Sequence, residues 1–520
     1  MELNDSPVQK SAVEIVIQKE KKSLRPVGPQ VIIVCAYLLV GMSVGMSLGH
    51  TSGLLPQLNS VNSSVYVDED TGSWIASLNV AAGPFGSILA GITMDQWGRR
   101  KITIVANSML FVGWLLVSVA YNVPALMVAK TIEGFARSMA ATTLTILIDE
   151  LADPNFRGFI LCFIMTCVSG GVVVISTLTA FLDWRTVSGV ATAVSLLSLF
   201  PFFVIPESPS WLVRNGRMDE ATQGLIWLWG PRRETEVQED LEFLKTRHSS
   251  KVQGCRTVQD FQKTCRAFFT PRILKPFFIL HVFGTIQVFC GSSILLYYTV
   301  DILSKIKEAG GGQIIDENRS AVVVFFVRIV GNIVTTLLII RIGRRPIALT
   351  SGIGSSVSAL ALGVLLITLS TKGTSPGSGE IESWLVFVLT MLFVLSISTG
   401  YLMLPVLMLG ETQAAHVRGF VCGYIYTVND LILGGTLKFY HSLLSILQIH
   451  GLFLLFGISC LLCTLFVYAF LPETQGKTLE QIEDYFRQPN VMWITRKKTS
   501  RCETRTVNGS QKLETNVLGP

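Results

Sequence analysis

Runs of about 20 apolar residues recur along this chain from one end to the other. A helix of that length spans the ~30 Å hydrocarbon core of a bilayer, and a helix satisfies its own backbone hydrogen bonds there. Only 15% of the 520 residues are charged, against about 25% in a typical globular domain. We therefore predict an all-α membrane protein with twelve transmembrane helices, near residues 30–50, 71–93, 102–121, 124–147, 158–181, 186–206, 276–300, 320–341, 346–369, 384–410, 419–444 and 449–471.

The second half of the chain repeats charged motifs of the first half in the same order. Glu150 with Arg157-Gly158 returns 261 positions later as Glu411 with Arg418-Gly419. Asp95-Gln-Trp-Gly-Arg-Arg100 is echoed by Ile340-Arg-Ile-Gly-Arg-Arg345, and Pro206-Glu-Ser-Pro209 by Pro472-Glu-Thr-Gln-Gly476. Since this repeat is about half the chain, far longer than a solenoid repeat, it indicates two like six-helix halves.

Lys and Arg collect in three segments that we place on the cytoplasmic side, where positive residues are retained. The tail before residue 30 has five, residues 207–275 have twelve and the tail after residue 471 has eight. Both termini are therefore predicted to be cytoplasmic, and the net charge of +6 reflects orientation, not nucleic-acid binding. The predicted division is a tail (1–29), a first bundle (30–206), a helical linker (207–275), a second bundle (276–471) and a second tail (472–520).

The cytoplasmic linker carries two short amphipathic patterns. Ala221, Leu225 and Leu228 recur at helical spacing, and Val237, Leu241 and Leu244 repeat the pattern. We expect short helices between the two bundles.

Other signals are few. Asn62 and Asn318 begin N-glycosylation sequons on loops predicted to face outside. Cys460 and Cys463 are one helical turn apart but lack companion ligands, so we interpret them as packing residues. The sequence offers no nucleophile–base constellation, metal-ligand cluster or cofactor loop, and His50 and His281 look isolated. We expect neither an enzyme nor a cofactor.

The duplicated motifs, with Gln287, Tyr297-Tyr298 and Pro472-Glu-Thr-Gln-Gly-Lys-Thr-Leu-Glu, resemble those of the sugar porter family of the major facilitator superfamily. The likeness runs from about residue 30 to 487 and is greatest for the insect facilitated trehalose transporters. It implies two six-helix bundles around a central cavity that opens to each side in turn. It also implies gating by charged pairs at the cytoplasmic helix ends, for which the candidates are Asp95, Arg99, Arg100, Glu150, Arg157, Arg341, Arg344, Glu411 and Arg418.

The cavity implied by this resemblance departs from the family pattern. Gln287 matches a sugar-binding glutamine, whereas several other ligand positions are changed: Met165 replaces a glutamine, Ser293 an asparagine, Ser398 a glutamate and Val406 a tryptophan. A buried sugar hydroxyl left unpaired costs about 1–3 kcal/mol, so these changes matter for recognition. The candidate substrate ligands are Gln287, Ser293, Tyr297, Tyr298, Arg328, Ser398, Asn429 and Met165.

Charged residues also appear at mid-membrane positions, where each is costly unless it faces a cavity or a partner. Glu133 and Arg137, one turn apart after Lys130, would neutralise one another or serve as coupling groups. Arg328 and Asp430 would pair within the second half or contact the substrate. The position of a coupling acid in proton-linked relatives is occupied by Thr51, with Lys130 as the partner, so facilitated diffusion is the default.

Three functions remain open from the sequence. The leading one is a facilitative carrier of trehalose or another sugar or polyol. The second is a carrier of a different organic solute, such as an anion, on the same fold, and the third is a solute sensor that does not transport. For all three we expect a monomer in the cell membrane whose partners are a small solute and the lipid bilayer, without nucleic acid.

Overall fold

The computed structural model describes residues 27–60, 65–151, 157–230, 233–249, 271–311, 316–339, 341–372, 379–412, 418–475 and 486. Within those ranges every regular element is helical. The first half contains α2 (Val27–Leu58), α3 (Glu69–Ala81), α4 (Gly83–Trp97), α5 (Arg99–Val119), α6 (Val123–Leu151), α7 (Arg157–Phe181), α8 (Trp184–Leu197) and η1 (Phe200–Phe203). The second half contains α13 (Pro271–Phe289), α14 (Ser292–Tyr297), α15 (Thr299–Ile306), η2 (Lys307–Gly311), α16 (Glu317–Leu338), α17 (Arg344–Lys372), α18 (Gly379–Ser398), α19 (Leu404–Thr412), α20 (Arg418–Lys438) and α21 (Tyr440–Phe470).

Nine helical segments of the described residues are long and apolar enough to cross a membrane. The other three predicted spans have physical reasons for failing that measure. α6 carries Lys130, Glu133 and Arg137 in its middle, the seventh span is broken into α13, α14 and α15, and α20 contains Asp430. The predicted twelve spans therefore all have helices at their positions.

The boundary between the eleventh and twelfth spans differs from the prediction. α20 ends at Lys438 and α21 begins at Tyr440, whereas the sequence suggested a continuous apolar span to residue 444. The predicted spans left a turn between residues 444 and 449. The structure has a kink there inside α21, where Gln448 has φ 54° and ψ 177°. Hydropathy averaged over a span missed the boundary, although Lys438 and His441 flank it.

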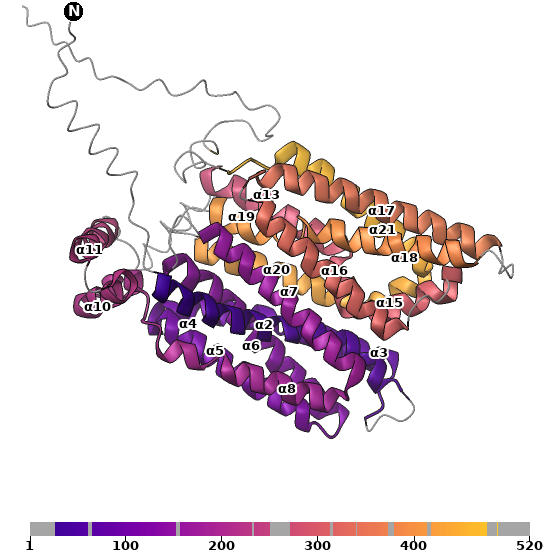
Figure 1. Ribbon diagram of the computed structural model, residues 1–520, viewed down its shortest axis with the longest axis horizontal. Coiled ribbons are helices and arrows are strands. Elements are labelled where there is room, and N and C mark those ends of the chain that lie inside the picture. Colours follow the sequence, from indigo (N-terminus) through magenta and orange to yellow (C-terminus); the bar gives the residue numbers. More distant parts are fainter. Residues whose placement is uncertain are drawn as a thin grey trace, which may run out of the picture.

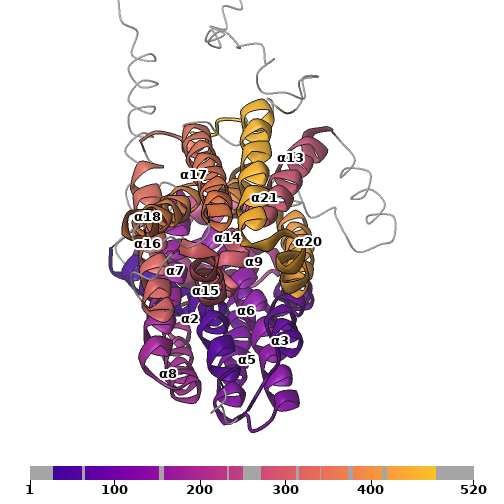
Figure 2. The ribbon, with the colours of Figure 1, turned by 90° about the vertical axis from the view of Figure 1, so that its right-hand side faces the viewer.

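The two halves lie side by side as separate bundles of helices (Figure 1). In the first, α2 packs on α7, and α6 packs on α4 and α5; in the second, α17 packs on α21 and α18. The halves meet where α7 packs on α16 and where α3 and α4 pack on α20. Seen from one end, the first-half and second-half helices form two groups with α14 and α15 near their junction (Figure 2).

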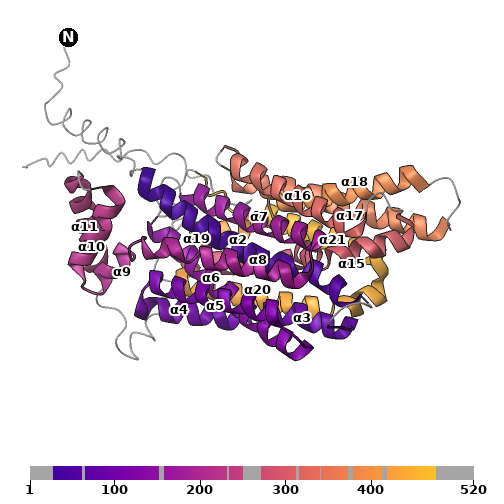
Figure 3. The same cartoon turned by 60° about the horizontal axis from the view of Figure 1, so that its bottom comes forward.

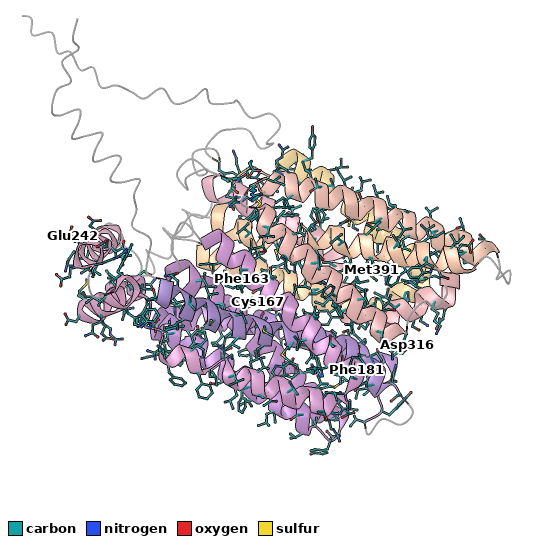
Figure 4. All side chains as sticks on the ribbon, viewed as in Figure 1. Phe163, Cys167, Phe181, Glu242, Asp316 and Met391 are labelled. Carbon is teal, nitrogen blue, oxygen red and sulfur yellow. The ribbon has the colours of Figure 1, made fainter. Side chains whose placement is uncertain are left out.

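The predicted linker helices are present. α9 (Pro209–Arg214), α10 (Met218–Trp229) and α11 (Glu234–Ser249) lie beyond one end of the bundles (Figure 3). Their apolar faces are buried at Ala221, Leu225, Leu228, Val237 and Leu241, as the spacing predicted. Glu242 on α11 marks this end, and Phe181 and Asp316 mark the opposite end (Figure 4). From the charge distribution we refer to the end with α11 as the cytoplasmic end and to the other as the outer end.

Candidate functional site

At the cytoplasmic end of the first half, Arg99 joins two acids. Its Nε lies 3.1 Å from Glu150 Oε2, and its Nη1 lies 3.2 Å from Asp95 Oδ1. Arg214 on α9 reaches the same Asp95 oxygen at 2.8 Å. The Arg99–Glu150 contact is largely shielded from solvent, whereas the Asp95 side chain is 56% exposed. The network therefore ties the ends of α4, α5, α6 and α9 together.

A third acid in this network, Glu207, was not among the predicted gate residues. Its Oε1 accepts the backbone N–H groups of Arg99 at 2.8 Å and Arg100 at 2.9 Å, which begin α5. A carboxylate is favourable there because the first N–H groups of a helix have no partner within the helix. Gly98 precedes them with φ 101°, and its lack of a Cβ leaves room for the carboxylate. Arg100 in turn donates to the carbonyls of Phe202 and Phe203 at the end of the sixth span.

The second half repeats this cap. Glu473 accepts the backbone N–H groups of Arg344 and Arg345, both at 3.1 Å, where α17 begins. Gly343 has φ 100°, as Gly98 does, and Arg345 donates to the carbonyl of Tyr468 at 2.6 Å. The duplicated Pro-Glu-Ser and Pro-Glu-Thr motifs were the sequence signal for both caps.

The remaining predicted gate residues of the second half are less defined. Arg341 is exposed, and its neighbour Ile340 lies outside the described residues. The side chains of Arg157, Glu411 and Arg418 also lie outside the described part of the chain. Their roles in gating stay predictions.

Inside the first half, Glu133 pairs with Lys130 and not with Arg137. Lys130 Nζ lies 2.9 Å from Glu133 Oε2 and 2.9 Å from His50 Nδ1, and all three side chains are fully buried. The Lys130 ammonium is also 5.4 Å from the centre of the Trp114 ring. The four-residue spacing between Glu133 and Arg137 favoured that pair, but the structure pairs Glu133 with Lys130, three residues before it. The sequence suggested that His50 is isolated, whereas the structure places it in contact with Lys130.

Arg328 and Asp430 do not pair in the described part of the structure. Arg328, which is 7% exposed, donates from Nη1 to the Ser292 carbonyl at 3.2 Å. Asp430 instead crosses to the first half, where its Oδ2 accepts the Ser138 hydroxyl at 3.0 Å. A Cβ at Gly83 would come within 2.5 Å of the same oxygen, so a glycine on α4 makes this approach possible. The predicted pair is therefore replaced by two separate contacts.

The candidate substrate ligands divide by their surroundings. Tyr297 is buried, its hydroxyl has no hydrogen-bond partner among the described residues, and the Asn429 amide oxygen is likewise unpaired. Gln287 donates to the Ser292 hydroxyl at 3.2 Å. Tyr298 is engaged, because its hydroxyl donates to the Leu437 carbonyl and its ring stacks on Tyr440.

For the other candidate ligands, the structure gives less support for contact with a solute. The Ser398 hydroxyl donates to the Val394 carbonyl of its own helix at 2.7 Å. Met165 on α7 and Ser293 on α14 are half-buried. The structure thus separates Tyr297, Asn429 and Gln287, which lie where the halves meet or beside the break in the seventh span, from Ser398, whose hydroxyl is occupied.

Two contacts between α7 and α16 also join the halves, and sequence reasoning missed them. Asn332 donates to the Ser169 hydroxyl, and the Thr166 and Thr336 hydroxyls lie 3.1 Å apart. Single hydroxyl and amide residues in an apolar helix carry no sequence signal that names their partners. Only the packing of α7 on α16 brings them together.

A polar cluster joins the two halves at the outer end. Lys438 at the end of α20 lies 2.5 Å from Asp70 and 3.0 Å from the Ser73 hydroxyl, both on α3. Its ammonium is 4.4 Å from the centre of the Trp74 ring. A hydrogen bond with Thr71 lowers the pKa of nearby Asp68, and the charge of Lys438 acts in the same direction. Acidic residues of one half thus face a cation of the other.

Known proteins match most of this chain. A family model described as "Sugar (and other) transporter" matches residues 31–486. The facilitated trehalose transporter Tret1 of Culex quinquefasciatus is 27% identical over 472 residues, which cover 91% of this chain and 88% of that protein. Tret1 of Drosophila yakuba is 30% identical over 456 residues, which cover 87% of this chain and 51% of that protein. The chain therefore aligns with about half the length of that second relative.

Solved structures share the fold. The proton:xylose symporter XylE of the major facilitator superfamily, bound to 6-bromo-6-deoxy-D-glucose, superposes with a TM-score of 0.70 over 88% of this chain and 98% of that one, at 18% identity. The inward-open conformation of XylE from E. coli gives a TM-score of 0.67, also at 18% identity. This likeness confirms the predicted major facilitator fold of two six-helix halves.

Proposed function

The chain belongs to the sugar transporter family, and from this premise we propose that it carries trehalose or another sugar or polyol across the membrane by alternating access. The proposed location is the cell membrane, where the chain acts as a monomer with both termini in the cytoplasm. The predicted boundaries of the two bundles and the linker are part of this proposal. The Tret1 matches support the solute class, and the fold supports the mechanism.

The observation that carries the proposal is a group of unpaired buried polar atoms where the halves meet. The Tyr297 hydroxyl, the Asn429 amide oxygen and Nε of Arg137 and Arg328 have no hydrogen-bond partner among the described residues. Tyr297 lies within electrostatic reach of Arg137, Glu133, Arg328 and Asp430. A buried polar atom without a partner costs about 1–3 kcal/mol, which hydroxyls of a bound sugar would offset.

The proposed gates lie at the two ends of this group. The Arg99–Glu150 contact ties cytoplasmic helix ends within the first half, and Lys438 with Asp70 joins the two halves at the outer end. Both pairs specify one arrangement of helices more than they add stability, because desolvation offsets the attraction of the shielded first pair and solvent screens the exposed second pair. We assign the first to closing the cytoplasmic side and the second to closing the outer side.

The proposed energetics is uniport. Thr51, at the position of a coupling acid in proton-linked relatives, cannot carry a charge. Lys130, the predicted partner, is already paired with Glu133 and contacts His50. Flux that does not respond to a pH gradient is expected. Uniport would be contradicted if an inward proton gradient accelerated solute flux and this acceleration were lost in the His50→Gln variant.

The proposal is tested with purified protein in proteoliposomes. The panel contains labelled trehalose, glucose, a polyol and an organic anion, and exchange at equal concentrations separates carriage from binding alone. We expect saturable exchange of at least one neutral sugar or polyol, and Tyr297→Phe is expected to raise its KM about tenfold through the loss of one hydroxyl contact. Exchange of the anion alone, or binding of sugars without exchange, would overturn the proposal.

A further inference from the structure

The seventh span is interrupted at Gly291, beside a predicted substrate ligand. α13 ends at Phe289 and α14 begins at Ser292, with Gly291 between them at φ 87° and ψ −7°. This left-handed conformation favours glycine, which lacks a Cβ. A Cβ at this position would also lie 2.5 Å from the ring of Phe456 on α21. The break is therefore a defined structure held against α21 and not a loosely wound turn.

Arg328 approaches the same break from α16. Its Nη1 donates to the carbonyl of Ser292, the first residue of α14. From within the seventh span, Gln287 donates to the Ser292 hydroxyl at 3.2 Å. Ser292 thus receives a backbone contact from α16 and a side-chain contact from α13, both immediately after the break.

The Arg328 guanidinium is poorly satisfied for a buried cation. Arginine has five N–H donors, and at 7% exposure the Nε of Arg328 has no partner among the described residues. A charge at this depth that served stability alone would be expected to have an acidic partner. The nearest acid suggested by the sequence, Asp430, contacts Ser138 in the other half instead. The placement of Arg328 is thus explained by the backbone it holds and not by a countercharge.

We propose that Arg328 is a positioning residue that holds the break of the seventh span and links its geometry to solute binding. The inference rests on the proposed function, because it assigns Arg328 a role within transport. Gln287 is a predicted sugar ligand, so a solute oxygen that takes its amide removes one of the two contacts on Ser292. Arg328 then determines how far α14 moves, and with it Tyr297 and the stacked Tyr298.

The arrangement beyond the break shows what such a movement reaches. α14 contacts both α2 of the first half and α20 of the second, and α15 contacts α2. Tyr298 donates to the Leu437 carbonyl, next to the Lys438 that joins the halves at the outer end. A change at Ser292 is therefore transmitted over a short path to the contact between the halves. This is why we assign Arg328 to the conformational step and not to solute affinity.

The test compares Arg328→Met and Arg328→Lys with the unmodified protein in lipid nanodiscs and proteoliposomes. Amide hydrogen exchange over residues 291–306 reports the order of the break directly. Arg319→Gln is the matched control, because Arg319 lies on the same helix and its side chain is 66% exposed. Gly291→Ala is a second, independent way to disturb the break, since it introduces a side chain at a positive φ.

We expect Arg328→Met to increase exchange over 291–306 at least tenfold and to reduce turnover about tenfold while KM changes less than twofold, because the hinge and not the solute contact is lost. Arg328→Lys keeps a donor for the Ser292 carbonyl. It should therefore restore part of the amide protection over 291–306 and part of the turnover. The effects of Gly291→Ala and Arg328→Met should not add, because both act on one element. Arg319→Gln should resemble the unmodified protein.

Two results would overturn the inference. One is unchanged amide exchange over 291–306 in Arg328→Met, and the other is a main effect on KM or solute choice with turnover retained, which marks a direct ligand. If Arg328→Met does not fold, Arg328→Lys and Gly291→Ala decide by the same two readouts. Failure of every sugar and polyol in the panel would refute the proposed function, whereas amide exchange without solute would still decide whether Arg328 holds the break.

Discussion

The two halves carry the same backbone cap but differ in the residue one turn before it. Glu207 and Glu473 both accept the first N–H groups of the following bundle helix, each after a glycine near φ 100°. In the first half, Asp95 and Glu150 then surround Arg99. The second half has the apolar Ile340 at the position of Asp95. The comparison teaches that helix capping has been kept in both copies, while the acid that Arg99 contacts one turn before the cap, Asp95, has an apolar counterpart in the other copy.

The partners of the buried charged residues also differ between the halves. In the first half, Lys130 and Glu133 form an ion pair within one helix. In the second, Arg328 turns to a backbone carbonyl and Asp430 crosses to the first half. A pair satisfied within one helix stays intact when the halves move, whereas a contact across halves has to change. Asp430, whose contact with Ser138 crosses between the halves, is therefore the charge whose environment we expect to depend on the transport state.

The largest effect is expected from breaking the pair that lies within one half. Glu133→Gln leaves Lys130 charged and buried without its acid, which should cost about 3–5 kcal/mol of stability. The thermal unfolding midpoint in nanodiscs measures this loss. Glu308→Gln is the control, because the Lys305–Glu308 pair has the same spacing but is exposed. Equal midpoints for the two variants would show that burial of the Lys130–Glu133 pair does not matter.

The shared caps should respond alike. Gly98→Ala and Gly343→Ala each place a Cβ against a cap glutamate at a strained φ, and each should cost about 1–3 kcal/mol. Gly189→Ala, where the added Cβ meets no atom within 4 Å, should be neutral. The same unfolding measurement applies to all three. If only the first-half variant loses stability, the two caps are not equivalent.

The two acids that contact Arg99 should differ in their effect on access. Glu150→Gln removes the shielded partner of Arg99 and should favour the inward-open state about tenfold, or ~1.4 kcal/mol. Asp95→Asn should have a smaller effect, because that carboxylate is 56% exposed and screened. Labelling of Ser293→Cys by an impermeant thiol reagent from the outer side should fall accordingly. Unchanged labelling in Glu150→Gln would refute the assigned gate.

The smallest effect is expected at the outer end. Lys438→Gln removes the ammonium that bridges Asp70 and Ser73, but the Asp70 side chain is 75% exposed, so the change is expected to be below about 1 kcal/mol and to shrink in high salt. Outside labelling of Ser293→Cys should rise, opposite to the result for Glu150→Gln. Lys305→Gln, at the same end but paired within one half, should leave labelling as it is. If outside labelling of Ser293→Cys decreased in Lys438→Gln, the Lys438–Asp70 contact would not be the one that closes the outer side.

Much of the fold was predictable because a membrane restricts the choices. Helices are required in hydrocarbon, so the apolar runs give the spans, and the duplicated motifs give the two halves. The linker helices followed from the same reasoning about apolar spacing. The limit appeared at the boundary between α20 and α21, because hydropathy averaged over about 20 residues reports burial in lipid and not the place where a chain turns.

Partners of the interior charges could not be predicted with the same success. Spacing allowed Glu133 to meet either Lys130 or Arg137, and the structure uses Lys130. The Arg99–Glu150 network and the caps followed patterns written twice in the chain. The chemistry of each charged group was visible in the sequence, but its neighbour on another helix was not.

The sequence by itself determined the helical spans, the two halves and the kinds of side chain available at their ends, because these follow from hydropathy and repetition along one chain. Only the tertiary structure decided that Asp430 contacts Ser138 and that Arg328 holds Ser292. The reason is physical: a buried polar group takes the partner that helix packing brings within about 3 Å, and packing depends on small residues such as Gly83 and Gly291 that local sequence cannot place in space.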